Sequence, residues 1–181
     1  MKVERASIAD VLVIEPRLFG DARGFFMETW NARTFKENGL TAQFVQDNHS
    51  RSAKNVVRGL HYQVQSSQGK LIRVTAGAVW DVAVDLRRGS PSFGRWTGTR
   101  LEAGSPRMLW IPPGFAHGFL VLSDSADVQY KTTDFYAPEH ERTLLWNDPA
   151  LAIDWPLAGR EPVLSDKDRH GTPFAQAETF A

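Results

Sequence analysis

The chain has 181 residues, of which 42% are hydrophobic, and it contains no cysteine. This length predicts one domain, residues 1–181, that buries roughly two-thirds or more of its unfolded surface without covalent support. The absence of cysteine excludes disulfides, a thiolate nucleophile and cysteine metal sites.

Charge and hydropathy narrow the classes of partner. Lys plus Arg and Asp plus Glu each number 21 and are interspersed, giving a formal net charge of zero. We therefore expect no nucleic-acid partner and no binding to an acidic membrane. The first residues lack the apolar core of a signal peptide, and no run approaches the ~20 apolar residues of a membrane span. A cytoplasmic protein is expected.

The predicted elements are mostly short strands. A single helix is predicted over residues 31–38, because Asn31 suits the N-cap and Asn38-Gly39 ends the pattern. The predicted strands, each bounded by turn-forming residues, are 11–14, 70–75, 78–86, 108–111, 118–122 and 128–135. Many strands with little helix favour an antiparallel sandwich or barrel. The tail after Trp155 is predicted as loop, and its segment 166–170 is too polar for a core.

The segment 58–63 carries the first chemical signal. It places His61 on a predicted strand, and Lys70 begins the next apolar run. Because side chains alternate along a strand, His61 shares a face with Gly59 and Gln63. A base beside a cation suits enolate chemistry. From these two residues alone, a core histidine and a solvated lysine are an equal alternative.

Two further strands show unusual polar alternation. On 78–86, Asp81 and Asp85 share a face with small residues; Asp81 is the better candidate for an inward carboxylate, whereas Asp85 is expected on a solvent face. Farther along, Tyr130 and Tyr136 share a face. They are either packed core aromatics or hydroxyl groups in a polar barrel interior.

The motif 111–119, with a proline-glycine turn before His117, resembles the second half of the cupin signature, where that histidine binds a metal. The first half needs two histidines two residues apart and a nearby glutamate, but here Gln63 follows His61 and Gln68 stands near the place of the acid. One or two neutral histidines would hold a first-row metal weakly. We therefore expect an organic acid–base site with no metal and no cofactor.

Taken together, the motifs resemble the dTDP-4-dehydrorhamnose 3,5-epimerase family, metal-free cupin enzymes of dTDP-L-rhamnose synthesis. The resemblance covers nearly the whole chain, in order and at family spacing. The matching stretches are 19–28, 46–50, 58–61, 70–71, 81–87, 90–94, 113–119, 130–131, 146–149 and 164–168. The fold it implies is mainly β, a jelly-roll (cupin) barrel with a few short helices.

The resemblance implies roles for four catalytic residues. A ketone at C4 of the sugar acidifies the hydrogens at C3 and C5, so one enolate mechanism can invert both centres. His61 would be the base, with Asp168 on its other nitrogen to fix the tautomer. Lys70 would stand beside the C4 oxygen as a fixed cation. Tyr130 would be the acid on the opposite face.

The resemblance also implies a dTDP-sugar substrate and a homodimer. The expected binding residues are Phe19, Arg23, Glu28, Gln46, Asn48, Arg58, His117, Tyr136, Glu141 and Lys167. Arginine suits bidentate phosphate recognition, and Tyr136 would stack on thymine, with Phe19 as a second candidate. The amino-terminal segment of each subunit would cross to the other, so that Phe19, Arg23 and Glu28 complete the neighbour's site.

Three functions stay open at this point. The leading one is the double epimerase. A related nucleotide-sugar enzyme that inverts one carbon or isomerises the ketone would use the same base, cation and nucleotide contacts. A non-catalytic jelly-roll sugar-binding module is the third, although it would have no need for these catalytic side chains.

Overall fold

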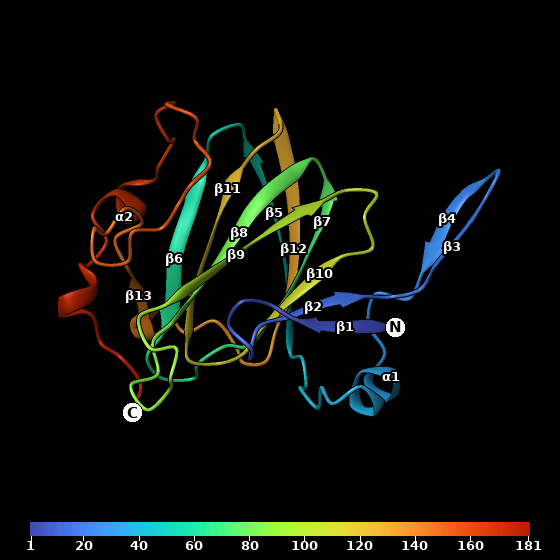
Figure 1. Cartoon of the computed structure of the whole chain (residues 1–181), viewed down its shortest axis with the longest axis horizontal. Helices are drawn as coiled ribbons and strands as arrows, with labels where there is room; N and C mark the ends of the chain where they lie inside the picture. Colours follow the sequence, from blue (N-terminus) through green and yellow to red (C-terminus); the bar gives the residue numbers. More distant parts are fainter.

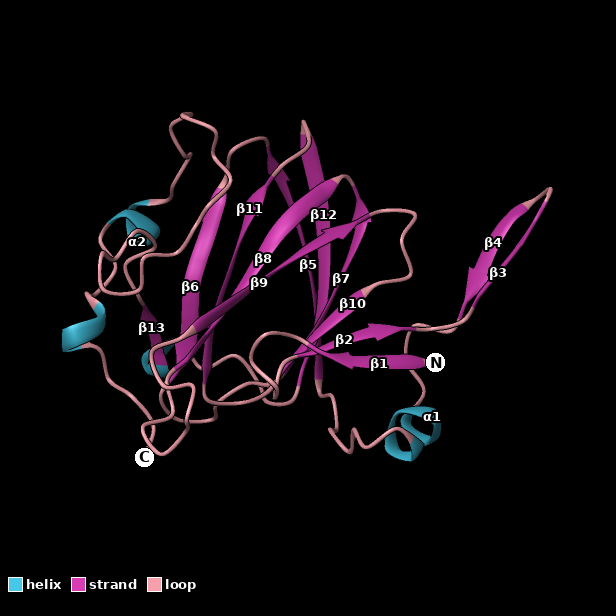
Figure 2. Cartoon of the chain, in the orientation of Figure 1, coloured by secondary structure: helices cyan, strands magenta, loops and turns pink.

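The computed structural model describes residues 1–181 as a structure of two facing sheets and a few short helices (Figures 1 and 2). The strands are β1 (Lys2–Arg5), β2 (Leu12–Glu15), β3 (Leu18–Asp21), β4 (Gly24–Met27), β5 (Gln46–Ala53), β6 (Val57–Gln63), β7 (Lys70–Ala76), β8 (Ala78–Asp85), β9 (Trp96–Glu102), β10 (Met108–Ile111), β11 (Phe115–Val121), β12 (Ser125–Thr132) and β13 (Glu141–Thr143). The helices are α1 (Ala32–Glu37) and α2 (Asp166–Arg169), with 3₁₀ turns over Pro138–His140 and Phe174–Gln176. No helix is long and apolar enough to cross a membrane.

The two sheets have the crossed connections of a jelly roll. One has the order β1-β2-β10-β7-β12-β5, and the other has the order β13-β6-β11-β8-β9. Consecutive strands such as β6 and β7, or β11 and β12, lie in different sheets. Their inner faces share one apolar core, to which β7 and β12 contribute from one side and β8 and β11 from the other. The expected mainly β jelly-roll barrel is confirmed.

Both outer faces are partly covered by segments with little regular structure. Helix α1 is capped as predicted, since Asn31 Oδ1 accepts the backbone N–H of Arg33 at 3.0 Å. Its Phe35 packs on the six-stranded sheet beside Leu71 and Trp110. The carboxy-terminal segment covers the five-stranded sheet and continues the apolar cluster of β6 and β8. This packing fixes the position of α2 against β6.

The predicted strand positions are close to those observed. The bounds of β10 are those predicted, whereas β11 begins three residues earlier than expected and β12 lies three residues earlier. Strand β5 was not predicted, because its sequence QDNHSRSA is almost entirely polar. In the fold, alternate β5 residues are half-buried and exposed, because one face borders a polar cavity and the other faces outward.

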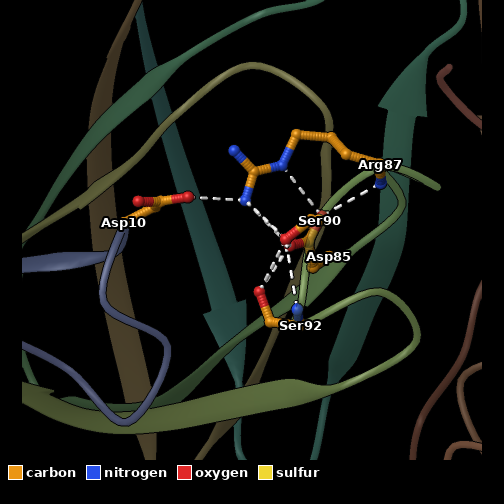
Figure 3. A network of polar contacts seen from close by, with 5 residues as sticks. All are labelled: Asp10, Asp85, Arg87, Ser90 and Ser92. Carbon is orange, nitrogen blue, oxygen red and sulfur yellow. Dashed lines mark hydrogen bonds and ion pairs between the residues drawn. The ribbon is translucent and has the colours of Figure 1, made fainter.

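Asp85 corrects the expectation of a solvent-facing carboxylate, because it is fully buried. It accepts hydrogen bonds from Arg87 Nε at 2.9 Å and from the hydroxyl groups of Ser90 and Ser92 at 2.6 Å each (Figure 3). Arg87 also reaches Asp10 at 2.7 Å. Burial alone would raise the pKa of Asp85, but these hydrogen bonds lower it to about 2. The network ties the turn after β8 to the amino-terminal segment.

The β3–β4 hairpin extends away from the barrel (Figure 1). It forms a two-stranded sheet of its own and pairs with no other strand. Its apolar side chains are exposed, Phe19 by 50%, Phe25 by 58% and Phe26 by 69%. An isolated hairpin of this kind is marginal in water, so its apolar surface is unexplained by the fold of one chain.

Candidate active site

A cavity of about 320 Å³ is lined by strands of both sheets. Nine of the fourteen predicted site residues line it, from strands β5, β6, β7, β11, β12 and β13 and the segment between β12 and β13. They are Gln46, Asn48, Arg58, His61, Lys70, His117, Tyr130, Tyr136 and Glu141. The fold therefore brings together residues that are far apart in the chain and that the resemblance assigned to one site.

A glycine pair shapes the strand that carries His61. Between two paired positions, β6 has one residue more than β11. This bulge turns Arg58 to the cavity side together with His61, although strict alternation would separate them. Gly59 has φ of +123°, and a Cβ there would lie 2.5 Å from Gly118 Cα. A Cβ on Gly118 would lie 2.6 Å from the carbonyl oxygen of Arg58, so the close approach requires glycine at both positions.

His61 is hydrogen-bonded to Asp168, the partner that the resemblance implied. The distance from His61 Nε2 to Asp168 Oδ1 is 2.6 Å, whereas Asp166 is exposed and makes no contact with the ring. Asp168 also accepts the backbone N–H of Gly59 at 3.2 Å and the hydroxyl of Ser165 at 2.7 Å. Burial raises the pKa of Asp168, but the bonds from His61 and Ser165 outweigh it, and the net shift is downward. The carboxylate stays ionised and His61 Nδ1 is left without a partner.

The position of Asp168 corrects the expectation that segment 166–170 is too polar for a core. Its carboxyl group is buried, with the residue only 3% exposed. The burial is tolerated because every oxygen of the carboxylate accepts at least one hydrogen bond. Helix α2, which begins at the Ser165 cap, supplies this geometry.

Lys70 begins β7 and is 7% exposed. The ammonium group has no hydrogen bond or ion pair within the chain. Burial lowers the pKa of Lys70 to about 8, although the charges of Asp81 and Glu141 oppose the shift. At neutral pH, this places a protonated donor without a protein partner in the cavity wall.

Tyr130 approaches from the other wall. It lies on β12 of the six-stranded sheet, as Lys70 does on β7, whereas His61 lies on β6 of the five-stranded sheet. Burial raises the pKa of the Tyr130 hydroxyl, so the phenol is protonated at neutral pH. A base and an acid thus face one cavity from different sheets.

The rim of the cavity is held by a polar cluster. Glu141 Oε1 is 2.8 Å from Lys167 Nζ, and its other oxygen accepts the hydroxyl of Tyr136 at 3.0 Å. The backbone N–H of Tyr136 donates to Gln46 at 3.0 Å. Lys167 therefore meets the site through Glu141 without lining the cavity. Tyr136 is 53% exposed, so its ring is available for stacking.

Three predicted residues lie away from the cavity of the same chain. Phe19 and Arg23 belong to the β3–β4 hairpin region, where Arg23 Nε bonds Asp21 at 3.1 Å. Glu28 accepts a hydrogen bond from Asn31 at 3.0 Å. None of the three lines the cavity of its own chain.

Sequence reasoning missed the partner of His117. Its Nε2 is 3.0 Å from each carboxylate oxygen of Asp81, whose inward orientation is confirmed. The alternation along β8 signalled an inward carboxylate, but only the register between β8 and β11 brings it to His117. Gln63, which shares the cavity face with His61 as expected, and Gln68 also line the site without having been assigned.

Comparison with known proteins agrees with this arrangement. Residues 5–176 match the sequence model of the family described as dTDP-4-dehydrorhamnose 3,5-epimerase. The chain is 62% identical over 181 residues to the dTDP-4-dehydrorhamnose 3,5-epimerase of Pseudomonas aeruginosa, covering 99% of each protein.

Solved structures are similar over most of the fold. A 3,5-epimerase from Legionella pneumophila in complex with dTDP-4-keto-L-rhamnose has a TM-score of 0.94 and 51% identity, covering 98% of this chain and 94% of that one. A 3'-monoepimerase from Streptomyces bikiniensis in complex with dTDP-quinovose has a TM-score of 0.88 and 32% identity, covering 95% of this chain and 87% of that one. Because the family match and the high identities extend over nearly its whole length, the chain belongs to the dTDP-4-dehydrorhamnose 3,5-epimerase family, a family of isomerases.

Proposed function

We propose that this protein converts dTDP-4-dehydro-6-deoxy-α-D-glucose to dTDP-4-dehydro-β-L-rhamnose by inverting C3 and C5, a step of dTDP-rhamnose biosynthesis. One observation carries the proposal: a carboxylate-bound histidine in one sheet faces a lysine and a tyrosine in the other, across one cavity. The names of the similar epimerases supply the substrate class.

His61 is the proposed base. Its Nε2 is held by Asp168, so Nδ1 is the ring nitrogen that can accept a proton from C3 or C5. Imidazole is the side chain most often used to accept and return protons near neutral pH. The ionised Asp168 stabilises the imidazolium that forms and keeps the ring in one orientation.

Lys70 and Tyr130 complete the proposed chemistry. Loss of the proton from carbon places negative charge on the C4 oxygen, and Lys70 is a buried cation without another partner that can bind it. Tyr130 is protonated and lies on a different sheet from His61, so it can return a proton to the opposite face of the carbon. Return from that face inverts the centre.

The nucleotide would be held at the open end of the cavity. Arg58 donates through Nε to the hydroxyl of Ser52 at 2.8 Å and through Nη2 to the carbonyl oxygen of Arg51 at 3.5 Å. Its other guanidinium N–H groups have no partner in the chain and can bind phosphate oxygens. Tyr136 offers an exposed ring for the thymine base, and Glu141 with Lys167 fixes the orientation of that ring. Gln46, Asn48 and His117 add polar contacts.

We also propose that the protein is a homodimer. The support is the β3–β4 hairpin, which carries exposed phenylalanines and pairs with no strand of its own barrel (Figure 1). Covering this surface with a second copy would remove it from water. The same contact would bring Phe19, Arg23 and Glu28 to the neighbour's cavity.

A second candidate function is inversion of one carbon only. It is favoured by the similarity to the 3'-monoepimerase from Streptomyces bikiniensis. Incubation with dTDP-4-dehydro-6-deoxy-glucose in deuterated water, followed by NMR of the product, separates the candidates. Deuterium at C3 and C5 supports the double epimerase, and deuterium at one carbon supports the monoepimerase. An absence of deuterium contradicts both epimerase functions and favours a sugar-binding module. The control is His61→Asn, whose product should carry no deuterium.

A further inference from the structure

A second histidine–carboxylate pair lies beside the proposed catalytic pair. His117 on β11 is directly opposite His61 on β6 in the antiparallel register, and both side chains line the cavity. His117 Nε2 is 3.0 Å from each oxygen of Asp81, which is fully buried on β8. The proposed mechanism assigns no role to this buried carboxylate.

Asp81 differs from the other buried carboxylate of the same strand face. Asp85, four residues along β8, accepts five hydrogen bonds from Arg87, Ser90 and Ser92. Asp81 accepts from His117 alone. Burial raises the pKa of Asp81, and only His117 and Lys70 oppose that shift. Asp85 is therefore saturated by its own turn, whereas the charge of Asp81 is balanced only by two residues of the cavity wall.

We propose that Asp81 is a positioning residue of the site, which keeps Lys70 positively charged and holds His117 in a fixed orientation toward the substrate. The inference rests on the proposed binding of the C4 oxygen by Lys70. Asp81 itself does not line the cavity and acts through these two side chains.

The effect on Lys70 follows from burial. Lys70 is 7% exposed and its ammonium group has no hydrogen bond, so it loses its proton more readily, because burial favours the neutral form. The charge of Asp81 is the largest influence that opposes this loss, ahead of Glu141. Without Asp81, more of the protein would hold a neutral Lys70, which cannot stabilise an enolate.

The effect on His117 follows from its hydrogen bond. With Nε2 committed to Asp81, Nδ1 is the ring nitrogen left for a substrate oxygen. This bond fixes the orientation of the His117 ring, and therefore of Nδ1. Asp168 fixes His61 in a similar way, but Asp168 also accepts hydrogen bonds from Gly59 and Ser165, whereas Asp81 accepts from His117 alone.

The other ionisable groups around Lys70 come from several strands. Those that line the cavity are Arg58, His61, His117, Tyr130, Tyr136 and Glu141, and Asp81 and Asp168 lie behind the two histidines. Of these, Asp81 and Glu141 act on Lys70 by charge. Glu141 is already paired with Lys167 at 2.8 Å, so Asp81 is the anion left for Lys70.

The test is the pH profile of kcat/KM for Asp81→Asn. The amide oxygen can still accept from His117, so the change removes charge and preserves shape. We expect the alkaline limb to move down by about one pH unit, the shift caused by a nearby opposite charge. The deficit should grow from about 1.3-fold at pH 6.5 to about tenfold above pH 9. Asp124→Asn, which removes an exposed carboxylate far from the cavity, should keep the wild-type profile.

A deficit that is the same at every pH would mean a structural role and would overturn the proposal. Should Asp81→Asn fail to fold, NMR of the wild-type protein decides. In protein with labelled histidine, the spectrum must show that the His117 ring carries a proton on Nε2. In protein with labelled lysine, the Lys70 signal must titrate near pH 8; this signal is assigned because it disappears in Lys70→Arg. An unprotonated His117 Nε2, or a Lys70 that is already neutral at pH 7, would refute the inference. These spectra need no substrate, so they are independent of the deuterium experiment on the proposed function.

Discussion

Replacing Asp168 with Asn removes one charge and little else. The amide oxygen can still accept from His61 and the backbone of Gly59, while the new NH₂ group can donate to Ser165 in place of the bond that the Ser165 hydroxyl now makes. Helix α2 and its cap should therefore be unchanged. The variant isolates the contribution of the Asp168 charge to the imidazolium of His61.

The size of the effect follows from electrostatics. Two unit charges about 4 Å apart interact by about 4 kcal/mol at an effective dielectric constant of about 20. Each loss of about 1.4 kcal/mol lowers a rate tenfold, and part of the loss is recovered by the neutral hydrogen bond. We expect kcat to fall by about 10²- to 10³-fold, with KM within about threefold, because Asp168 lies behind His61 and not in the substrate cavity.

Steady-state kinetics with Asp166→Asn as the matched control tests this reasoning. Asp166 is two residues away, exposed, and makes no contact with His61. It should retain wild-type turnover. A defect in Asp166→Asn that is absent from Asp168→Asn would show that the assignment of the histidine's partner is wrong.

Three further predictions concern pH, metals and assembly. The value of kcat/KM should fall as pH rises through about 8, since Lys70 is active as the cation and loses its proton there. Arginine keeps its charge at this pH, so in Lys70→Arg the alkaline fall should move to higher pH; a fall that stays near pH 8 would refute this assignment. Dialysis against a strong chelator should leave the rate unchanged, because the Nε2 atoms of His61 and His117 are both bound to carboxylates; activity lost and restored by one divalent ion would contradict this. Light scattering should give about twice the 20.3 kDa chain mass, and a fully active monomer would remove the proposed sharing of the hairpin.

Much of the fold could be predicted because period-two apolar alternation survives in the buried strands. The alternation on β8 correctly separated Asp81 from the apolar face of its strand. It could not tell whether that face meets solvent, so Asp85 was misplaced. The answer depends on Arg87 and two serines of the following turn, which fold back over the carboxylate.

The candidate site was less accessible to reasoning from the residues themselves. His61 and Asp168 are 107 positions apart, and no local pattern links a strand histidine to an aspartate in a polar tail. The family resemblance linked them, and the Ser165 cap explains how the tail can be buried. The bulge at Gly59, which turns Arg58 to the cavity, leaves no signal beyond a glycine within a strand.

The most direct test of the proposed mechanism separates the base from the acid. His61→Asn should abolish both solvent deuterium exchange and epimerisation, because no enolate forms. Tyr130→Phe leaves His61, Asp168 and Lys70 in place, so the enolate should still form and be reprotonated on its starting face. Exchange should persist in Tyr130→Phe while inverted product falls by roughly 10²- to 10⁴-fold, the contribution of one general acid. Equal loss of exchange and inversion in Tyr130→Phe would contradict the assignment of acid and base to opposite faces.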